Sequence, residues 1–157
     1  SLSTCGLTEK FDKLAALNLQ LTLSVSLHAP DDDTRNMLMP VNRKRGVAEL
    51  YSACDRYFEK TGRRISFEYA MIDGVNDTPE HARMLAENIR KIGGHVNLIP
   101  LNHVDERRFE PSKPENMKKF IDILQKSGVN VTVRRKLGGD VDASCGQLRR
   151  KMAHSES

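Results

Sequence analysis

The sequence has no tryptophan, few aromatic residues and few cysteines, and each shortage narrows the kinds of protein it can be. Aromatic side chains make up 5% of the 157 residues, which gives only weak support to a base-stacking surface for single strands. Cys5, Cys54 and Cys145 are far apart and odd in number, so a disulfide framework is not expected and a reducing cytoplasm fits better. No apolar run approaches the roughly 18 residues of a membrane span, and no signal-peptide pattern occurs. We therefore expect a soluble cytoplasmic protein without a membrane partner.

Basic residues are in modest excess, and their placement matters more than their number. Lysine and arginine total 25 against 21 acidic residues, for a net charge of +4. They cluster at residues 43–45, 63–64, 107–108, 134–136 and 149–151. Most clusters fall at predicted loops or strand ends. If those ends share one face, that face would bind phosphate groups; the alternative is a scatter of solvated charges.

Hydrophobic periodicity predicts strands that alternate with helices along a single domain. Apolar residues at every second position predict strands near residues 19–26, 64–71, 96–101 and 129–134. Residues 1–4 resemble the end of a further strand. Helical spacing predicts helices between these strands, with Asp31 and Thr78 as N-caps and a capping box formed by Ser112 and Glu115.

This alternation predicts an α/β fold with a parallel sheet. The strands are too few to close a barrel, so a partial (β/α) barrel fits best and a doubly wound sheet is the second alternative. In both architectures functional residues gather at the carboxyl ends of the strands. The candidates at those ends include Ser26, His28, Asn102 and the last stretch of the chain, and we expect them to share one rim.

The last stretch follows a predicted strand and contains a Gly-Gly pair, two acids and a lone cysteine. Gly138 and Gly139 permit a free turn before Asp140, Asp142 and Cys145. Loops beyond strand ends are where α/β proteins present chemistry. From position alone, a reactive thiol and a buried structural cysteine remain equally open.

Five short strings occur in order over nearly the whole chain. They are Ser26-Leu27-His28-Ala29-Pro30, Met39-Pro40-Val41-Asn42, Asp73-Gly74-Val75-Asn76-Asp77, Val96-Asn97-Leu98-Ile99-Pro100 and Asp142-Ala143-Ser144-Cys145-Gly146-Gln147-Leu148. Together they resemble the C-terminal half of the radical S-adenosylmethionine (SAM) enzymes that methylate C2 of an adenine in 23S rRNA and, in some members, in tRNA. The family that methylates C8 of the same adenine has Ser-Pro in place of Ala29-Pro30 and Pro-Gly-Val in place of Asp73-Gly74-Val75. The resemblance therefore favours C2, with the C8 family as the alternative.

The resemblance implies a reaction in which a cysteine carries the methyl group. Adenine C2 is too electron-poor to take a methyl group directly from SAM. The family first methylates a cysteine sulfur, which Cys145 matches, and then uses a radical from a second SAM to activate that methyl group. The SAM contacts carry over to Ser3, to Ser26, Leu27 and His28, and to Asn102. Hydroxyl, carboxamide and backbone groups at strand ends suit the ribose and carboxylate of such a ligand.

The chain departs from the family in its cysteines. The family holds a 4Fe-4S cluster through Cys-x-x-x-Cys-x-x-Cys, and Cys5, Cys54 and Cys145 have no such spacing. The resemblance therefore implies that residues 1–157 correspond to the C-terminal portion of a radical SAM barrel domain. The cluster-binding part and the N-terminal RNA-binding part would lie in a missing N-terminal half, and an electron-donor protein would reduce the cluster. We expect this portion to be inactive alone, Cys5 to be a tolerated small residue and Cys54 to be core.

Two other classes of protein remain open from the residues themselves. A stand-alone RNA-binding α/β module would need only the basic clusters and would be indifferent to Cys145. A different (β/α) enzyme, such as an aldolase-like lyase, would need a lysine or a metal pair at the rim. Asp140 and Asp142 are more typical of turn residues than of metal ligands.

Overall fold

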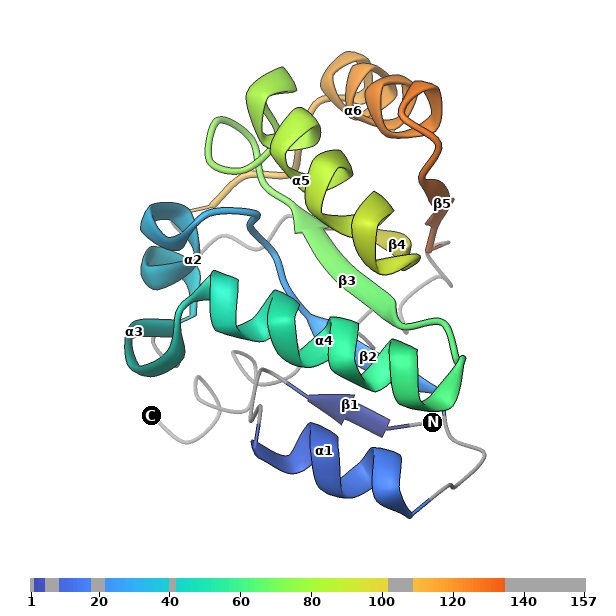
Figure 1. The fold of residues 1–157 in the computed structure, drawn as a ribbon. Coiled ribbons are helices and arrows are strands. Elements are labelled where there is room, and N and C mark those ends of the chain that lie inside the picture. Colours follow the sequence, from blue (N-terminus) through green and yellow to red (C-terminus); the bar gives the residue numbers. More distant parts are fainter. Residues whose placement is uncertain (1, 5–8, 18–21, 40–41, 102–108, 135–157) are drawn as a thin grey trace.

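The computed structural model describes residues 2–4, 9–17, 22–39, 42–101 and 109–134 (Figure 1). The strands in this part of the chain are β1 (Leu2–Thr4), β2 (Leu23–Ser26), β3 (Ser66–Met71), β4 (His95–Pro100) and β5 (Asn130–Val133). The helices are α1 (Glu9–Ala16), α2 (Asp32–Leu38), α3 (Asn42–Arg45), α4 (Val47–Thr61), α5 (Pro79–Ile92) and α6 (Pro114–Lys126).

The strands form one parallel sheet in the order β1-β2-β3-β4-β5, which is also their order along the chain. The predicted parallel sheet is confirmed, and the first residues of the chain do supply an additional edge strand. The strand bounds differ from the predicted ones by two residues or fewer for β3 to β5, while β2 begins later, at Leu23. Residues 18–21, where that strand was predicted to begin, lie outside the described part.

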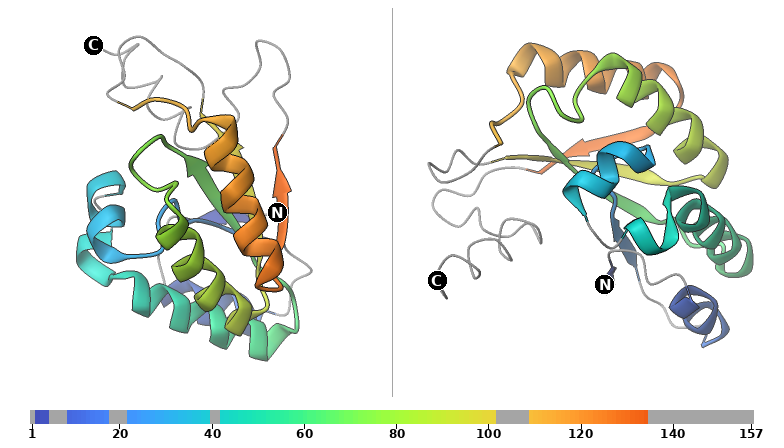
Figure 2. Two further views of the ribbon diagram at one scale, coloured as in Figure 1. Left: turned by 90° about the horizontal axis from the view of Figure 1, so that it is seen from above. Right: turned by 90° about the vertical axis from the view of Figure 1, so that its left-hand side faces the viewer.

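The long helices form a single layer on one face of the sheet (Figure 2). Neighbouring helices pack in chain order, α1 with α4, α4 with α5, and α5 with α6. A doubly wound sheet has helices on both faces, so that alternative is wrong for the described part of the chain. The one-sided arrangement is typical of part of a (β/α) barrel, in which the helices lie outside.

The core lies between the sheet and the helices. Along β3 the residues Phe67, Tyr69 and Met71 are buried, whereas the intervening positions are partly exposed. Helix α6 reaches the same core through Phe120, whose ring centroid lies 5.2 Å from that of Tyr69. Full burial of such a side chain stabilises the folded protein by about 1.5–3 kcal/mol. The apolar face of the sheet therefore accounts for the attachment of the helices.

Side-chain caps begin two of the described helices, α2 and α5, and one predicted cap is wrong. Asp31 accepts a hydrogen bond from the Thr34 N–H at 3.0 Å, which begins α2 as predicted. Thr78 likewise caps α5, with a proline in its first turn. The Ser112 hydroxyl instead donates to Asp77 at 2.7 Å, and α6 begins two residues later without a side-chain cap. A buried carboxylate from another loop competes successfully for this hydroxyl.

None of the helices in the described residues is both long enough and apolar enough to cross a membrane. The longest, α4, has 15 residues and a charged outer face.

Gly94 permits close contact between the end of α5 and β3, and its replacement tests the packing. A Cβ atom there would lie 2.5 Å from Cε2 of the buried Phe67 ring. We expect Gly94→Ala to lower the free energy of unfolding by about 1–3 kcal/mol through overpacking, measured by urea denaturation. In a Phe67→Leu background the same change should cost less, because the ring is gone. An equal cost in both backgrounds would contradict the steric explanation.

Gly62→Ala is the matched control. Gly62 ends α4 with a φ of 66° and has nothing within 4 Å of an added Cβ. Its cost should be only the backbone strain of the left-handed conformation, roughly 1–2 kcal/mol, and should not depend on residue 67.

Candidate functional site

The carboxyl ends of β2 and β3 lie side by side and carry the residues predicted to bind a ligand. Parallel pairing places Ser26, the last residue of β2, opposite Glu68 of β3. The chain then continues beyond the sheet through Leu27 and His28. The backbone N–H groups of both residues donate to the Glu68 carbonyl, at 2.9 and 3.3 Å. The predicted Ser26-Leu27-His28 segment is therefore attached to β3 at Glu68.

His28 has an unusual backbone and a fixed ring. Its φ of 61° is the single positive value among non-glycine residues in the described ranges, a conformation that costs about 1–3 kcal/mol. Its ring Nδ1 accepts a hydrogen bond from the Ala70 N–H at 2.9 Å. Because a backbone N–H can only donate, Nδ1 carries no proton and the neutral ring carries its proton on Nε2.

Asn76 holds His28 from the loop that follows β3. Its amide is fully buried and donates to the carbonyls of His28 at 2.8 Å and Ala70 at 2.6 Å. Its Oδ1 accepts from the Ile72 N–H at 2.8 Å. Every polar atom of this side chain is thus paired, as burial requires. The sequence marks Asn76 as part of one of the five strings that carry the resemblance, but it did not predict this role.

Arg35 holds the same segment from helix α2. Its side chain is 2% exposed and projects from α2. The guanidinium donates from Nη2 to the carbonyl of Ser26 and from Nε to that of Leu27, both at 2.9 Å. The sequence did not predict a role for Arg35, because nothing in the local pattern around it signals a buried arginine.

The sheet face away from the helices is polar. Ser26, Glu68, Asn97 and Thr132 occupy one row of register across β2 to β5. Glu68 pairs with Arg134, which follows β5, at 3.2 Å. Parallel sheets are usually apolar on both faces. A polar, helix-free face suits a surface that faces a ligand.

The predicted site residues are described to different extents. Leu27 is fully buried, side chain and backbone alike. Ser3 lies on β1 opposite Ser24, two residues before the end of β2, and its side chain is not described. Asn102 and Cys145, with the Gly138-Gly139 loop, lie outside the described residues. Their predicted position at this rim stays a prediction.

Cys54 is a core residue, as predicted. It is fully buried on α4, and burial raises the pKa of its thiol to about 12. The thiolate form that binds iron or attacks a methyl group is therefore absent near neutral pH. No cluster of His, Cys, Asp and Glu able to hold a metal ion occurs in the part of the chain that the structure describes.

The described basic clusters do not share one face. Arg43 on α3 and Arg134 after β5 lie toward the carboxyl ends of the strands. Arg63 and Arg64 precede β3 and lie at the amino ends. The clusters at residues 107–108 and 149–151 lie outside the described part. A single phosphate-binding face is therefore not formed by the clusters that can be placed.

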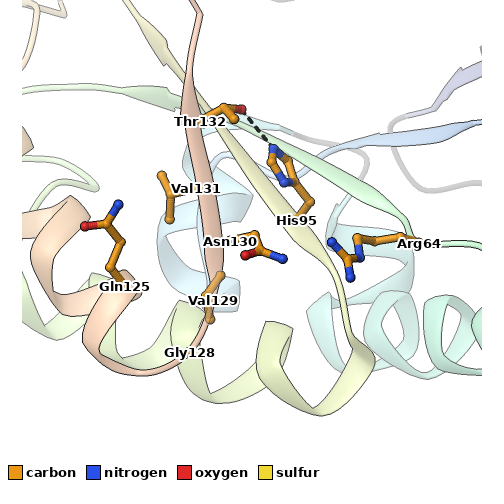
Figure 3. A pocket seen from close by; sticks show the side chains of 8 residues that line it. All are labelled: Arg64, His95, Gln125, Gly128, Val129, Asn130, Val131 and Thr132. Atoms are coloured by element: carbon orange, nitrogen blue, oxygen red, sulfur yellow. Dashed lines mark hydrogen bonds between the residues drawn. The ribbon is translucent and has the colours of Figure 1, made fainter.

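A shallow groove of about 560 Å³ opens at the amino end of β4 and β5 (Figure 3). Its polar lining includes Arg64, His95 and Thr132, with a 2.8 Å hydrogen bond between the His95 Nε2 and the Thr132 hydroxyl. Burial and the nearby Arg64 charge lower the pKa of His95, which favours its neutral form. The groove lies at the other end of the strands from His28 and is separate from the candidate site.

Solved structures define the class of this fold. A radical SAM methyltransferase from Sphaerobacter thermophilus is 47% identical and matches with a TM-score of 0.86, covering 92% of this chain and 42% of that one. A domain of pyruvate-formate lyase-activating enzyme from Bacteroides vulgatus matches with a TM-score of 0.67, over 85% of this chain and 79% of that one, at 19% identity. The second likeness shows the fold alone. The chain thus has the partial (β/α) barrel fold of radical SAM type that its sequence predicts.

Curated relatives identify the homologous proteins. The chain is 52% identical over 151 residues to a probable dual-specificity RNA methyltransferase RlmN from Desulforamulus reducens, covering 96% of this chain and 43% of the relative. Identity is 47% over 157 residues to the protein of the same name from Clostridium tetani, 45% of whose length is covered. No protein-family model matches. The predicted resemblance is confirmed: the chain is homologous to part of the radical SAM RNA methyltransferases, and spans less than half the length of these relatives.

Removal of the Asn76 amide should strongly destabilise the folded protein at the candidate site. Asn76→Ala leaves the Ile72 N–H and the His28 and Ala70 carbonyls without this partner. We expect the free energy of unfolding to fall by about 3 kcal/mol or more, since each buried unpaired group costs about 1–3 kcal/mol. Urea denaturation measures the loss.

Asn88→Ala provides the control for that substitution. The Asn88 amide donates to the Met84 carbonyl in an exposed position on α5, so its loss should cost less than about 1 kcal/mol. Similar losses for the two variants would refute the structural role of Asn76.

The Cys54 thiol should give the protein a distinct loss of stability at alkaline pH. Its pKa is about 12 in the folded protein against 9.0 for the ordinary thiol, so the unfolded chain loses its proton first. The stabilising effect is complete below pH 9 and is lost as the pH rises, at up to about 1.4 kcal/mol per pH unit. The advantage of the native protein over Cys54→Ala should therefore shrink by about 1 kcal/mol between pH 8 and pH 10, measured by urea denaturation. A constant difference would contradict the shifted pKa.

Proposed function

We propose that residues 1–157 are the C-terminal portion of a radical SAM RNA methyltransferase that methylates C2 of an adenine in 23S rRNA, and also in tRNA. The observation that carries the proposal is the Ser26-Leu27-His28 segment, which is fixed at the carboxyl ends of the strands beside a polar sheet face. The chain is 52% identical to a relative named as a probable dual-specificity RNA methyltransferase. The relatives are described as dual-specificity RNA methyltransferases, which supports more than one RNA substrate.

The residues at the carboxyl ends of the strands fit a SAM ligand. The Ser26 hydroxyl and the His28 ring provide polar groups at strand ends, where α/β proteins bind ligands. Ser3 and Asn102 complete the proposed set. The N–H and carbonyl of Leu27 already bond to Glu68 and Arg35, so Leu27 supports the site through the shape of its backbone.

The described residues do not fit an iron–sulfur cluster. Cys54 is the one cysteine among them and is buried in the core. We therefore assign the 4Fe-4S cluster to the cluster-binding part of the whole protein, outside these 157 residues. There it would supply the radical, with electrons from an electron-donor protein.

Cys145 is the proposed methyl carrier. Its thiol loses a proton and the sulfur attacks the methyl group of SAM, so that a sulfur–carbon bond forms on Cys145. The bond between that methyl group and the sulfonium of SAM breaks, and S-adenosylhomocysteine leaves. For this carbon to reach adenine C2, a 5′-deoxyadenosyl radical would remove one hydrogen atom from the S-methyl group and a carbon–carbon bond would form at C2, with loss of one electron and of the C2 proton. A second cysteine would then attack the Cys145 sulfur, so that the sulfur–carbon bond breaks, a disulfide forms and the released carbon takes up a proton. Chemistry that needs a free thiol and an RNA substrate fits the cytoplasm.

Replacement of Cys145 tests this function in the whole protein. Cys145→Ala and Cys145→Ser should both abolish methylation, because neither side chain offers a sulfur to carry the methyl group. Cleavage of SAM to 5′-deoxyadenosine should remain possible, since its ligands are other residues. Mass spectrometry of digested 23S rRNA and tRNA detects 2-methyladenosine, and chromatography detects 5′-deoxyadenosine.

The same assay separates the alternatives. The 157 residues alone should give neither product, since they lack the three-cysteine motif. Formation of 8-methyladenosine would favour the C8 family. Persistent C2 methylation by Cys145→Ala would show that the methyl group travels by another route.

A further inference from the structure

Arg35 is a buried cation that needs an explanation. Removal of a guanidinium from water costs several kcal/mol unless its donors are paired, and this side chain is only 2% exposed. Its Nε and Nη2 donate to the carbonyls of Leu27 and Ser26. These are two consecutive residues of the segment proposed to bind SAM.

The guanidinium is itself fixed by a second set of contacts. Its Nη1 donates to Oδ1 of Asn42 at 2.8 Å, and Asn42 is 3% exposed. The Asn42 amide then donates to Asp32 at 2.9 Å and to Asn36 at 2.7 Å. Asp32 also accepts from the Val47 N–H at 2.7 Å. Helices α2, α3 and α4 thus all take part in positioning Arg35.

The segment is consequently held by groups from α2, from β3 and from the loop after β3. Three consecutive carbonyls of the segment accept hydrogen bonds from buried side chains. Arg35 donates to those of Ser26 and Leu27, and Asn76 donates to that of His28. On the sheet side, Ala70 fixes the His28 ring. A charged hydrogen bond is worth about 1.5–3 kcal/mol, enough to offset the cost of the left-handed backbone at His28.

We propose that Arg35 is a positioning residue for the SAM site. Its guanidinium holds the Ser26 and Leu27 carbonyls so that the Ser26 hydroxyl and His28 ring have their ligand-binding arrangement before the ligand arrives. Preorganisation of this kind raises affinity by lowering the cost of ordering on binding. This inference rests on the proposed function and adds a residue that does not touch the ligand.

Arg35→Lys is the main test, in the full-length protein with its cluster reconstituted. Lysine keeps the charge but has a single nitrogen, which cannot bond both carbonyls in the planar geometry of the guanidinium. We expect SAM affinity, measured by calorimetry, to fall about tenfold or more, while the KM for RNA stays unchanged. The NMR signals of the His28 ring nitrogens in the free protein should also change.

Arg56→Lys is the matched control. Arg56 lies on α4, is half exposed and pairs with Asp12 at 3.4 Å, so this change should alter neither SAM affinity nor the His28 signals. Asn42→Ala is the second variant, in case Arg35→Lys does not fold. It removes the Nη1 acceptor and leaves Arg35 in place, and a smaller loss of SAM affinity is expected.

Several outcomes would overturn the inference. A folded Arg35→Lys protein with native SAM affinity and native His28 signals would do so, as would an equal loss of affinity for SAM and RNA. Should Arg35→Lys not fold, native SAM affinity in Asn42→Ala would do the same. Failure of the native protein to bind SAM would instead overturn the proposed function. The His28 signals would then still decide whether Arg35 holds the segment.

Discussion

The alternation of side chains along the parallel strands is the constraint on which the rest of the structure depends. On β3, Phe67, Tyr69 and Met71 face one way and are buried, while Ser66 and Glu68 face the other. Helices can attach only to the apolar face, because burial of the polar face without partners would cost more than it returned. A one-sided sheet follows, and its free face is the polar surface beside the candidate site.

The candidate site depends on buried polar groups more than on exposed ones. Arg35 on α2 and Asn76 in the loop after β3 donate to consecutive carbonyls of one segment. Such groups are costly when unpaired but rigid when every donor and acceptor is used. This explains how a strained His28 persists at the end of a short strand, and why its ring has a single tautomer.

Comparison with homologues and the chemistry of the cysteines both indicate that this chain holds only some of the groups that the proposed reaction needs. The chain matches radical SAM RNA methyltransferases over nearly its full length yet spans less than half of theirs. Cys54, the one described cysteine, lies in the core with a raised pKa. In the proposed function this portion binds SAM and carries the methyl group, and the radical chemistry requires groups contributed by the rest of the protein.

The sequence by itself determined the order of strands and helices, the caps Asp31 and Thr78, and the Ser26-Leu27-His28 segment, because these depend on neighbours within a few residues. Tertiary structure decided what distant residues do. Ser112 was predicted to cap α6 but bonds to Asp77, 35 residues away, and Asn76 reaches His28 across 48 residues. The loops after β2, β3 and β4 meet at the carboxyl ends of the strands, which brings such groups together. A pattern of neighbouring residues does not specify contacts between residues this far apart in the chain.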